Sequence, residues 1–189
     1  MEVSRVKRKW PENPVHELEA FDYIFENADV QELYKDMSGS FDAYGRANFH
    51  IYIDDEELAN KLADDGLYVK IIAPKNEGDP VRWRLKMLID MSETWKDGKP
   101  RTVPEIHYID SITHVDRVLP NIQAVGTGLD GHIKTCDIQA HPKWYDKAGN
   151  CGYNLYVEWG QFVVEENEAR LRQRELSAKY APEDPDMPF

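Results

Sequence analysis

Three cations alternate with apolar residues in the segment from Val81 to Ile89. Successive side chains of an extended strand point to opposite faces, so Arg82, Arg84 and Lys86 are expected to share one face while the apolar residues face the interior. Cations two residues apart lie ~7 Å from one another, close to the spacing of phosphates along an extended nucleic-acid strand. The segment therefore predicts a surface that holds phosphate groups. The alternative is a solvated sheet face or an edge strand protected by charge.

Aromatic residues stand beside cations in three further segments. Tyr52 alternates with His50, Tyr68 precedes Lys70 by two residues, and the polar segment 92–103 carries Trp95 among basic residues. Single-stranded nucleic acid is held by cations that follow its backbone and by rings that stack on its bases, each stacked base contributing ~1–3 kcal/mol. We therefore predict phosphate contacts from Lys70, Arg82, Arg84 and Lys86, stacking on Tyr52, Tyr68 and Trp95, and a clamp formed by Arg46, Lys96, Lys99 and Arg101. A second mixture of cations and rings occurs in another expected loop, 143–152, at Lys143, Trp144, Tyr145 and Lys147.

The final segment, 181–189, combines acidic residues with prolines and closes with a phenylalanine. Prolines remove backbone donors and fix the backbone, so regular structure is not expected there. The phenylalanine ring offers an apolar plug, and the carboxylates steer the peptide toward basic surfaces. We predict a tail that binds partner proteins and competes with nucleic acid for the chain's own basic groove; a merely solubilising tail is the alternative. Its predicted partner-binding residues are Glu183, Asp184, Asp186 and Phe189.

The 189 residues include 23 basic and 35 acidic side chains, a net charge of -12. This length suits one mid-sized domain with flexible extensions. A net negative charge opposes a polyanionic partner unless the charge is segregated along the chain. The charge is segregated, because the first ten residues are basic and the segment from Glu12 to Asp36 is acidic. No segment has the ~18 apolar residues of a membrane helix or the apolar run of a secretory signal, so we expect no membrane contact and a cytoplasmic location.

Short segments of alternating hydrophobicity indicate strands at 21–25, 47–53, 67–72, 81–91, 106–109, 132–139 and 153–164. Acidic residues at 54–57, followed by apolar residues at helical spacing, indicate one short helix that ends at Gly66. These elements favour a mainly β fold, an OB-fold-like barrel. The expected organisation is a basic N-terminal arm and linker at 1–20, an OB-like DNA-binding domain at 21–164, a short C-terminal helix at 165–180 and an acidic tail at 181–189.

Two resemblances agree with this interpretation. The last seven residues, Glu-Asp-Pro-Asp-Met-Pro-Phe, resemble the acidic tip of bacterial single-stranded-DNA-binding proteins. The segments 44–49 and 65–70, with the acidic helix between them, resemble the opening of phage single-stranded-DNA-binding proteins of OB-fold type, and Val115-Asp116 with 152–157 resemble their closing half.

The resemblance implies a protein without catalytic activity or cofactor. It would coat and protect single-stranded DNA during phage replication or recombination in the cytoplasm of the bacterial host, and recruit partner enzymes through its acidic tip. The chain departs from the pattern in its basic arm, in the loop around Trp95 and at Gly126 to Gly131.

Other patterns indicate different chemistry. Zinc-capable side chains occur at irregular spacing, and these are His132, Cys136, His141 and Cys151. The run Asp54–Glu57 suits Mg²⁺ in a nuclease, or a helix cap. The glycines at 126, 128 and 131 look like a small dinucleotide fingerprint, but no helical pattern follows them, so a turn is expected. We assign no catalytic residue and no metal, leave a homo-oligomer open, and retain as the second functional class an acidic interaction protein, either a DNA mimic or a counter-defence factor.

Overall fold

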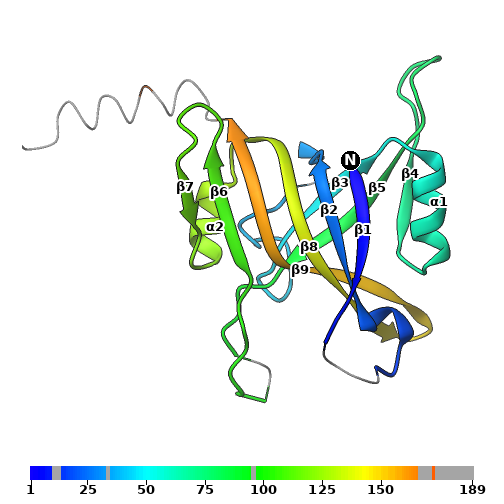
Figure 1. The fold of residues 1–189 in the computed structure, drawn as a ribbon, viewed down its shortest axis with the longest axis horizontal. Coiled ribbons are helices and arrows are strands. Elements are labelled where there is room, and N and C mark those ends of the chain that lie inside the picture. Colours follow the sequence, from blue (N-terminus) through cyan, green and yellow to red (C-terminus); the bar gives the residue numbers. More distant parts are fainter. Residues whose placement is uncertain (10–13, 33–34, 95–96, 166–171, 173–189) are drawn as a thin grey trace, which may run out of the picture.

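A computed structural model describes residues 1–9, 14–32, 35–94, 97–165 and 172 (Figure 1). Its main feature is a nine-stranded mixed sheet with the order β1-β2-β8-β9-β5-β3, in which β4 also pairs with β5, and β6 pairs with both β9 and β7. The strands are β1 (Glu2–Lys7), β2 (Phe21–Ala28), β3 (Ala47–Ile53), β4 (Val69–Ile72), β5 (Arg82–Ile89), β6 (Glu105–Asp110), β7 (Asp116–Val118), β8 (His132–Lys147) and β9 (Asn150–Glu165). The helices are the 3-10 turn η1 (Glu17–Ala20), α1 (Glu56–Asp64) and α2 (Ile122–Gly128). The mainly β prediction is confirmed, and the open, mixed sheet is compatible with an OB-like fold.

The core lies on the inner face of the curled sheet. Strand β3 shows why, because its apolar residues recur at every second position and are all fully buried, while the polar residues between them are half-buried. Phe49 of β3 meets Phe162 of β9 edge to face, with ring centroids 5.5 Å apart, so strands distant in sequence share one core. Trp83 of β5 is also buried, as the alternation predicts.

Two helices cover opposite sides of this core (Figure 1). Asp55 caps α1 by accepting hydrogen bonds from the backbone of Glu57 and Leu58, and α1 buries Ala59 and Leu62. The acidic run before this helix is therefore a cap, which was one of its two predicted roles. Asn121 caps α2 by accepting from the backbone of Ala124.

The expectation of a separate basic arm at the N-terminus is wrong, because β1 pairs with β2 over its whole length and belongs to the sheet. The two arginines of this basic segment are neutralised locally. Arg5 bonds to Asp65 and lies over the ring of Phe21, and Arg8 donates to Asp22 at 2.6 Å and to Glu158 at 2.9 Å. Burial opposes ionisation of Asp22, yet hydrogen bonds from His141, Gln139 and Arg8 hold the pKa of that carboxyl below its usual range.

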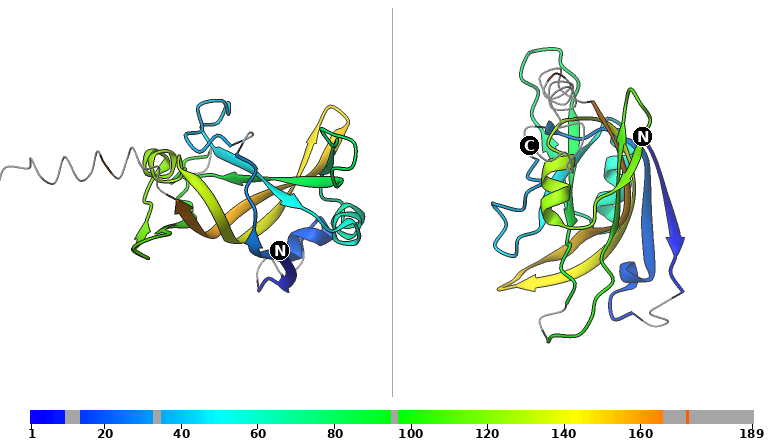
Figure 2. Two further views of the ribbon diagram at one scale, coloured as in Figure 1. Left: turned by 90° about the horizontal axis from the view of Figure 1, so that it is seen from above. Right: turned by 90° about the vertical axis from the view of Figure 1, so that its left-hand side faces the viewer.

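Two segments that we expected to be irregular, the glycine-rich turn at 126–131 and the loop at 143–152, contain regular structure. The glycines at 126 and 128 lie in α2, where helix and neighbouring chain approach so closely that a Cβ would come within 3.1 Å of Ser38 or Leu119. The segment 143–152 is the outer end of the β8–β9 hairpin, which projects from the body of the molecule (Figure 2, yellow). The hairpin turns at Ala148 and Gly149, both with positive φ, 51° and 88°.

The predicted C-terminal helix at 165–180 and the tail at 181–189 fall outside the described residues, except for Glu165, which ends β9, and Arg172. Within the described ranges, neither α-helix has the length and hydropathy needed to cross a bilayer.

Candidate nucleic-acid interface

Strands β3, β5 and β4 form a continuous patch of sheet. Its outer face carries Tyr52 and the four residues that we predicted to contact phosphates, Lys70, Arg82, Arg84 and Lys86. The register places Tyr52 of β3 opposite Arg84 of β5, and Arg84 opposite Lys70 of β4. Directly paired residues project from the same face of a sheet, so these three side chains form a row across the strands. His50 and Lys86 form the adjacent part of the next row.

The two lysines of this face, Lys70 and Lys86, are exposed. Lys70 lies 5.1 Å from the ring centroid of Tyr68, which is 62% exposed. Lys86 lies on the open surface opposite His50. Among the residues that the structure describes, no carboxylate forms an ion pair with Lys70 or Lys86. Their ammonium groups are thus available to an incoming anion.

Arg82 is held differently. Its Nε and one terminal nitrogen both donate to the carboxylate of Asp54, the second bond being 3.0 Å long, and its guanidinium lies 4.0 Å from the ring centroid of Tyr52. The hydrogen bond from Arg82 lowers the pKa of Asp54 and keeps it ionised. Arg82, which we predicted to bind phosphate, is therefore already paired with a carboxylate, and its guanidinium plane is fixed against an aromatic ring.

Arg46 is paired in a similar way at the other end of β3. It donates to both carboxylate oxygens of Asp42, at 2.9 and 3.0 Å, and its third nitrogen donates to the hydroxyl of Tyr156 at 2.8 Å. The hydrogen bond from Arg46 lowers the pKa of Asp42 to about 2. The guanidinium also lies 4.7 Å from the ring centroid of Tyr44, so Arg46 joins a carboxylate to aromatic side chains.

A groove of about 650 Å³ opens beside Arg46. Three segments far apart in sequence form it: the loop before β3, the loop after β5 and the outer end of the β8–β9 hairpin. Its lining is rich in cations and tyrosines and consists of Tyr44, Arg46, Asp90, Ser92, Thr94, Asp97, Arg101, Lys143, Tyr145, Lys147, Asn154 and Tyr156. Arg101 forms an ion pair with Asp90, and the predicted clamp residue Lys99 pairs with Asp97 at 2.8 Å.

The groove contains residues that we had not assigned to DNA binding. Lys143, Tyr145 and Lys147 lie at alternate positions of β8, so they share one face of the hairpin. The sequence analysis noted these residues as a second mixture of cations and rings. It placed them in a loop, however, and nothing in the sequence indicated that this loop lies beside Arg46. Only the pairing of β9 with β5, through Leu155 and Tyr156, brings the hairpin to this end of the sheet.

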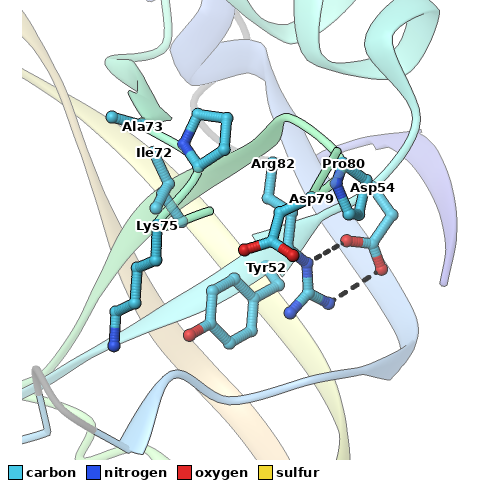
Figure 3. Close-up of a pocket in the computed structure, with 9 residues that line it drawn as sticks. Tyr52, Asp54, Ile72, Ala73, Lys75, Asp79, Pro80 and Arg82 are labelled. Carbon is cyan, nitrogen blue, oxygen red and sulfur yellow. Dashed lines mark hydrogen bonds and ion pairs between the residues drawn. The ribbon is translucent and has the colours of Figure 1, made fainter. Parts of the chain in front are cut away.

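A second pocket, of about 430 Å³, lies at the opposite end of β5 (Figure 3). The connection between β4 and β5 forms one wall, and Tyr52, Asp54 and Arg82 form the other. In Figure 1 this connection and the loop after β5 project in opposite directions. We call this second pocket the end pocket.

The outer faces of β3 and β5 join the groove to the end pocket. Strand β3 has seven residues and therefore spans ~23 Å at ~3.3 Å per residue. We call this surface the outer track, formed by Tyr44, Arg46, His50, Tyr52, Tyr68, Lys70, Arg82, Arg84, Lys86, Arg101, Lys143, Tyr145, Lys147 and Tyr156. It brings together most of the predicted contacts, whereas Trp95 and Lys96 fall outside the described residues.

The zinc-capable side chains noted in the sequence do not come together in the described part of the structure. Cys136 is buried beside Ala28, Cys151 is exposed near the hairpin tip, and His141 faces Asp22. In the described ranges, no three His, Cys, Asp or Glu side chains gather as a metal would require.

Comparisons with known proteins complete the description. A family model described as "Putative phage ssDNA-binding domain" matches residues 16–185. No curated protein matches the chain. Among solved structures, the C-terminally truncated single-stranded DNA-binding protein of bacteriophage Enc34 aligns with a TM-score of 0.48 and 11% identity, covering 86% of this chain and 96% of that one. The single-stranded DNA-binding protein gp2.5 of bacteriophage T7 aligns with a TM-score of 0.41 and 14% identity, covering 85% and 98%.

Proposed function

Because the chain belongs to the phage ssDNA-binding domain family, whose model spans 170 residues from 16 to 185, we propose that it binds single-stranded DNA along the outer track. In this proposal the strand follows β3 and β5 between the groove and the end pocket. Lys70, Arg84 and Lys86 contact phosphates, and tyrosines on both sides of them stack on bases. The proposed role is non-enzymatic.

The observation that carries the proposal is the row of Tyr52, Arg84 and Lys70 across three strands. A ring and two cations on one face supply the two interactions that hold a single strand without reading its sequence. The paired arginines do not oppose this role. The carboxylate partners of Arg46 and Arg101 occupy positions that phosphate oxygens take in the complex, so binding there exchanges one anion for another. Arg82 keeps its pair with Asp54.

The pairing of arginines with carboxylates weighs against the alternative function, an acidic protein that mimics DNA. A mimic of DNA needs uncompensated carboxylates clustered on the folded body. On the outer track, the carboxylates of Asp42, Asp54 and Asp90 each neutralise an arginine.

The proposed biological role is to coat and protect single strands during phage replication or recombination, in the cytoplasm of the host. Recruitment of replication or recombination enzymes is assigned to the acidic tail, through Glu183, Asp184, Asp186 and Phe189. The support for this part is the tail's composition, which combines an apolar ring with a cluster of carboxylates.

We expect binding to oligo-dT to weaken steeply between 50 and 200 mM salt, because each phosphate that is neutralised releases counterions. Duplex DNA of the same length should bind much less well, since its stacked bases are closed to the tyrosines. Gel shifts with single-stranded and duplex DNA at both salt levels provide the measurement. Binding that is insensitive to salt, or equal for both forms, contradicts the proposal.

Deletion of residues 182–189 should keep or raise the affinity for oligo-dT, because it removes anionic groups that compete for the basic groove. The same deletion should abolish capture of a replication or recombination enzyme in a pull-down from infected cells. Substituting the three acids by their amides while retaining Phe189 separates charge from the ring. Capture that survives the full deletion shows that the tail is not the recruiting element.

A further inference from the structure

The end pocket contains groups that backbone binding does not require. Six of its nine lining residues come from the β4–β5 side: Ile72, Ala73, Pro74, Lys75, Asp79 and Pro80. Prolines and an aliphatic side chain give it apolar walls, and its volume of about 430 Å³ falls in the range of small-ligand sites. A surface that only follows phosphates needs cations, but it needs neither apolar walls nor a carboxylate.

We propose that the end pocket receives one nucleobase of a bound single strand and selects, through the carboxylate of Asp79, bases that carry an exocyclic amino group. The inference rests on the proposed function, since it places the pocket at one end of the bound strand. It adds a base preference to a surface that otherwise ignores sequence.

The pocket offers a flat platform for a base. Arg82 lies with its guanidinium 4.0 Å from the Tyr52 ring centroid, and two hydrogen bonds to Asp54 fix its orientation. Guanidinium planes and aromatic rings both stack on unpaired bases. Figure 3 shows Tyr52 and Arg82 in the middle of the pocket, between Lys75 on one side and Asp54 on the other.

Asp79 supplies the selective group. Its Oδ2 accepts hydrogen bonds from the backbone and side-chain nitrogens of Asn76, at 2.9 and 3.0 Å, which hold the carboxylate in place. Within the described part of the chain, nothing donates to its Oδ1. Carboxylates accept hydrogen bonds from the amino groups of cytosine, adenine and guanine, and thymine has no such group.

Lys75 completes a site for a whole nucleotide. No described residue forms an ion pair with it, and it lies on the side of the pocket away from Asp54 (Figure 3). A phosphate at Lys75, a base on the Arg82 platform and an amino group at Asp79 together make three contacts to one nucleotide. The charge of Lys75 also offsets the repulsion between Asp79 and the phosphates.

Fluorescence anisotropy with labelled (dT)12, (dC)12 and a (dT)12 that carries one central guanine tests this proposal. We expect the wild-type chain to bind (dC)12 and the guanine-containing strand about tenfold more tightly than (dT)12, since one well-made base contact gives discrimination of that order. In Asp79→Asn the carboxylate becomes an amide that also donates, so the preference should disappear while (dT)12 is still bound.

Glu77→Gln is the matched control, because it removes the same charge from the same connection without altering a residue that lines the end pocket. It should keep the wild-type preference. Equal affinity of the wild type for all three strands, or a preference that persists in Asp79→Asn, overturns the inference and leaves the proposed function intact. Failure of every strand to bind overturns the proposed function itself.

Discussion

The double reversal Arg84→Glu with Lys86→Glu is expected to lower affinity for oligo-dT on the order of 100-fold at 50 mM salt. Both side chains lie on the outer face of β5, in neighbouring rows that also hold Tyr52 and His50. The change removes two phosphate contacts and adds two negative charges where the backbone passes. The salt dependence should also flatten, by ~0.7 in the slope of log affinity against log salt for each lost contact. Anisotropy titrations at several salt levels measure both effects.

The control variant is Lys61→Glu in α1 combined with Lys134→Glu in β8, which reverses two charges outside the outer track. Lys61 is exposed, and Lys134 forms only a surface ion pair with Glu165 at 3.1 Å, which contributes little to stability. The control chain has the same net charge as the test chain, so any general repulsion of DNA is equal in the two. We expect the control to lose less than about threefold in affinity. Equal losses in both variants show that net charge, and not the outer track, governs binding.

The second large effect is expected from Lys143→Glu with Lys147→Glu on the β8–β9 hairpin. Both lysines line the groove beside Arg46 and Arg101, whose own charges are shared with Asp42 and Asp90. We expect a loss of about 30-fold in oligo-dT affinity, because the reversals leave the groove with a net negative charge. The hairpin tip is exposed, so the melting temperature should stay within ~2 °C of wild type.

The length of the DNA separates this groove from the rest of the outer track. The groove and the end pocket lie at opposite ends of β3 and β5, so a short strand can occupy one end without reaching the other. The hairpin variant should therefore lose more affinity for a 20-nucleotide strand than for a 3-nucleotide strand, whose phosphates span only ~14 Å at a spacing of ~7 Å. A loss that is independent of length shows that the hairpin variant acts through the fold and not through the groove.

The sequence was most informative where alternation and burial coincide. Strand β3 alternates strictly and β5 alternates from Arg82 to Met87, so the inner and outer faces of these segments were predicted correctly. The register that places Tyr52 opposite Arg84 was not predicted. The cap of α1 was also recognisable, because carboxylates at a helix start satisfy free backbone donors. These features depend on local physics alone.

The errors occur where distant contacts override local preference. Helix α2 contains two glycines and has weak intrinsic propensity, yet it forms because Val125 and Leu129 are buried and because Gly126 and Gly128 allow close packing. Strand β1 was hidden by the charge of the basic segment, in which Asp65 neutralises Arg5, and Asp22 and Glu158 neutralise Arg8 in the folded chain. No local pattern specifies such partners.

The pairing of the arginines was also beyond the sequence. Asp42 lies four residues before Arg46, and this spacing indicates a possible ion pair, but the sequence does not show that Tyr156 completes the contact from β9. The consequence is functional. Within the described part of the chain, Lys70 and Lys86 of the outer track form no ion pair with a carboxylate, whereas Arg46 and Arg101 require a carboxylate to be displaced. We therefore expect these two lysines to contribute more than the paired arginines to the salt-dependent part of binding.

Photo-crosslinking tests the central claim most directly, because it reports where the bases lie. The wild-type chain is bound to an oligo-dT strand in which 5-iodouracil replaces thymine at single positions, irradiated, and digested for mass spectrometry. We predict crosslinks to Tyr52, Tyr68 and Tyr145, which line the outer track from the end pocket to the groove. Crosslinks confined to β6, β7 and α2 would contradict the account, since none of these elements contributes a residue to the outer track.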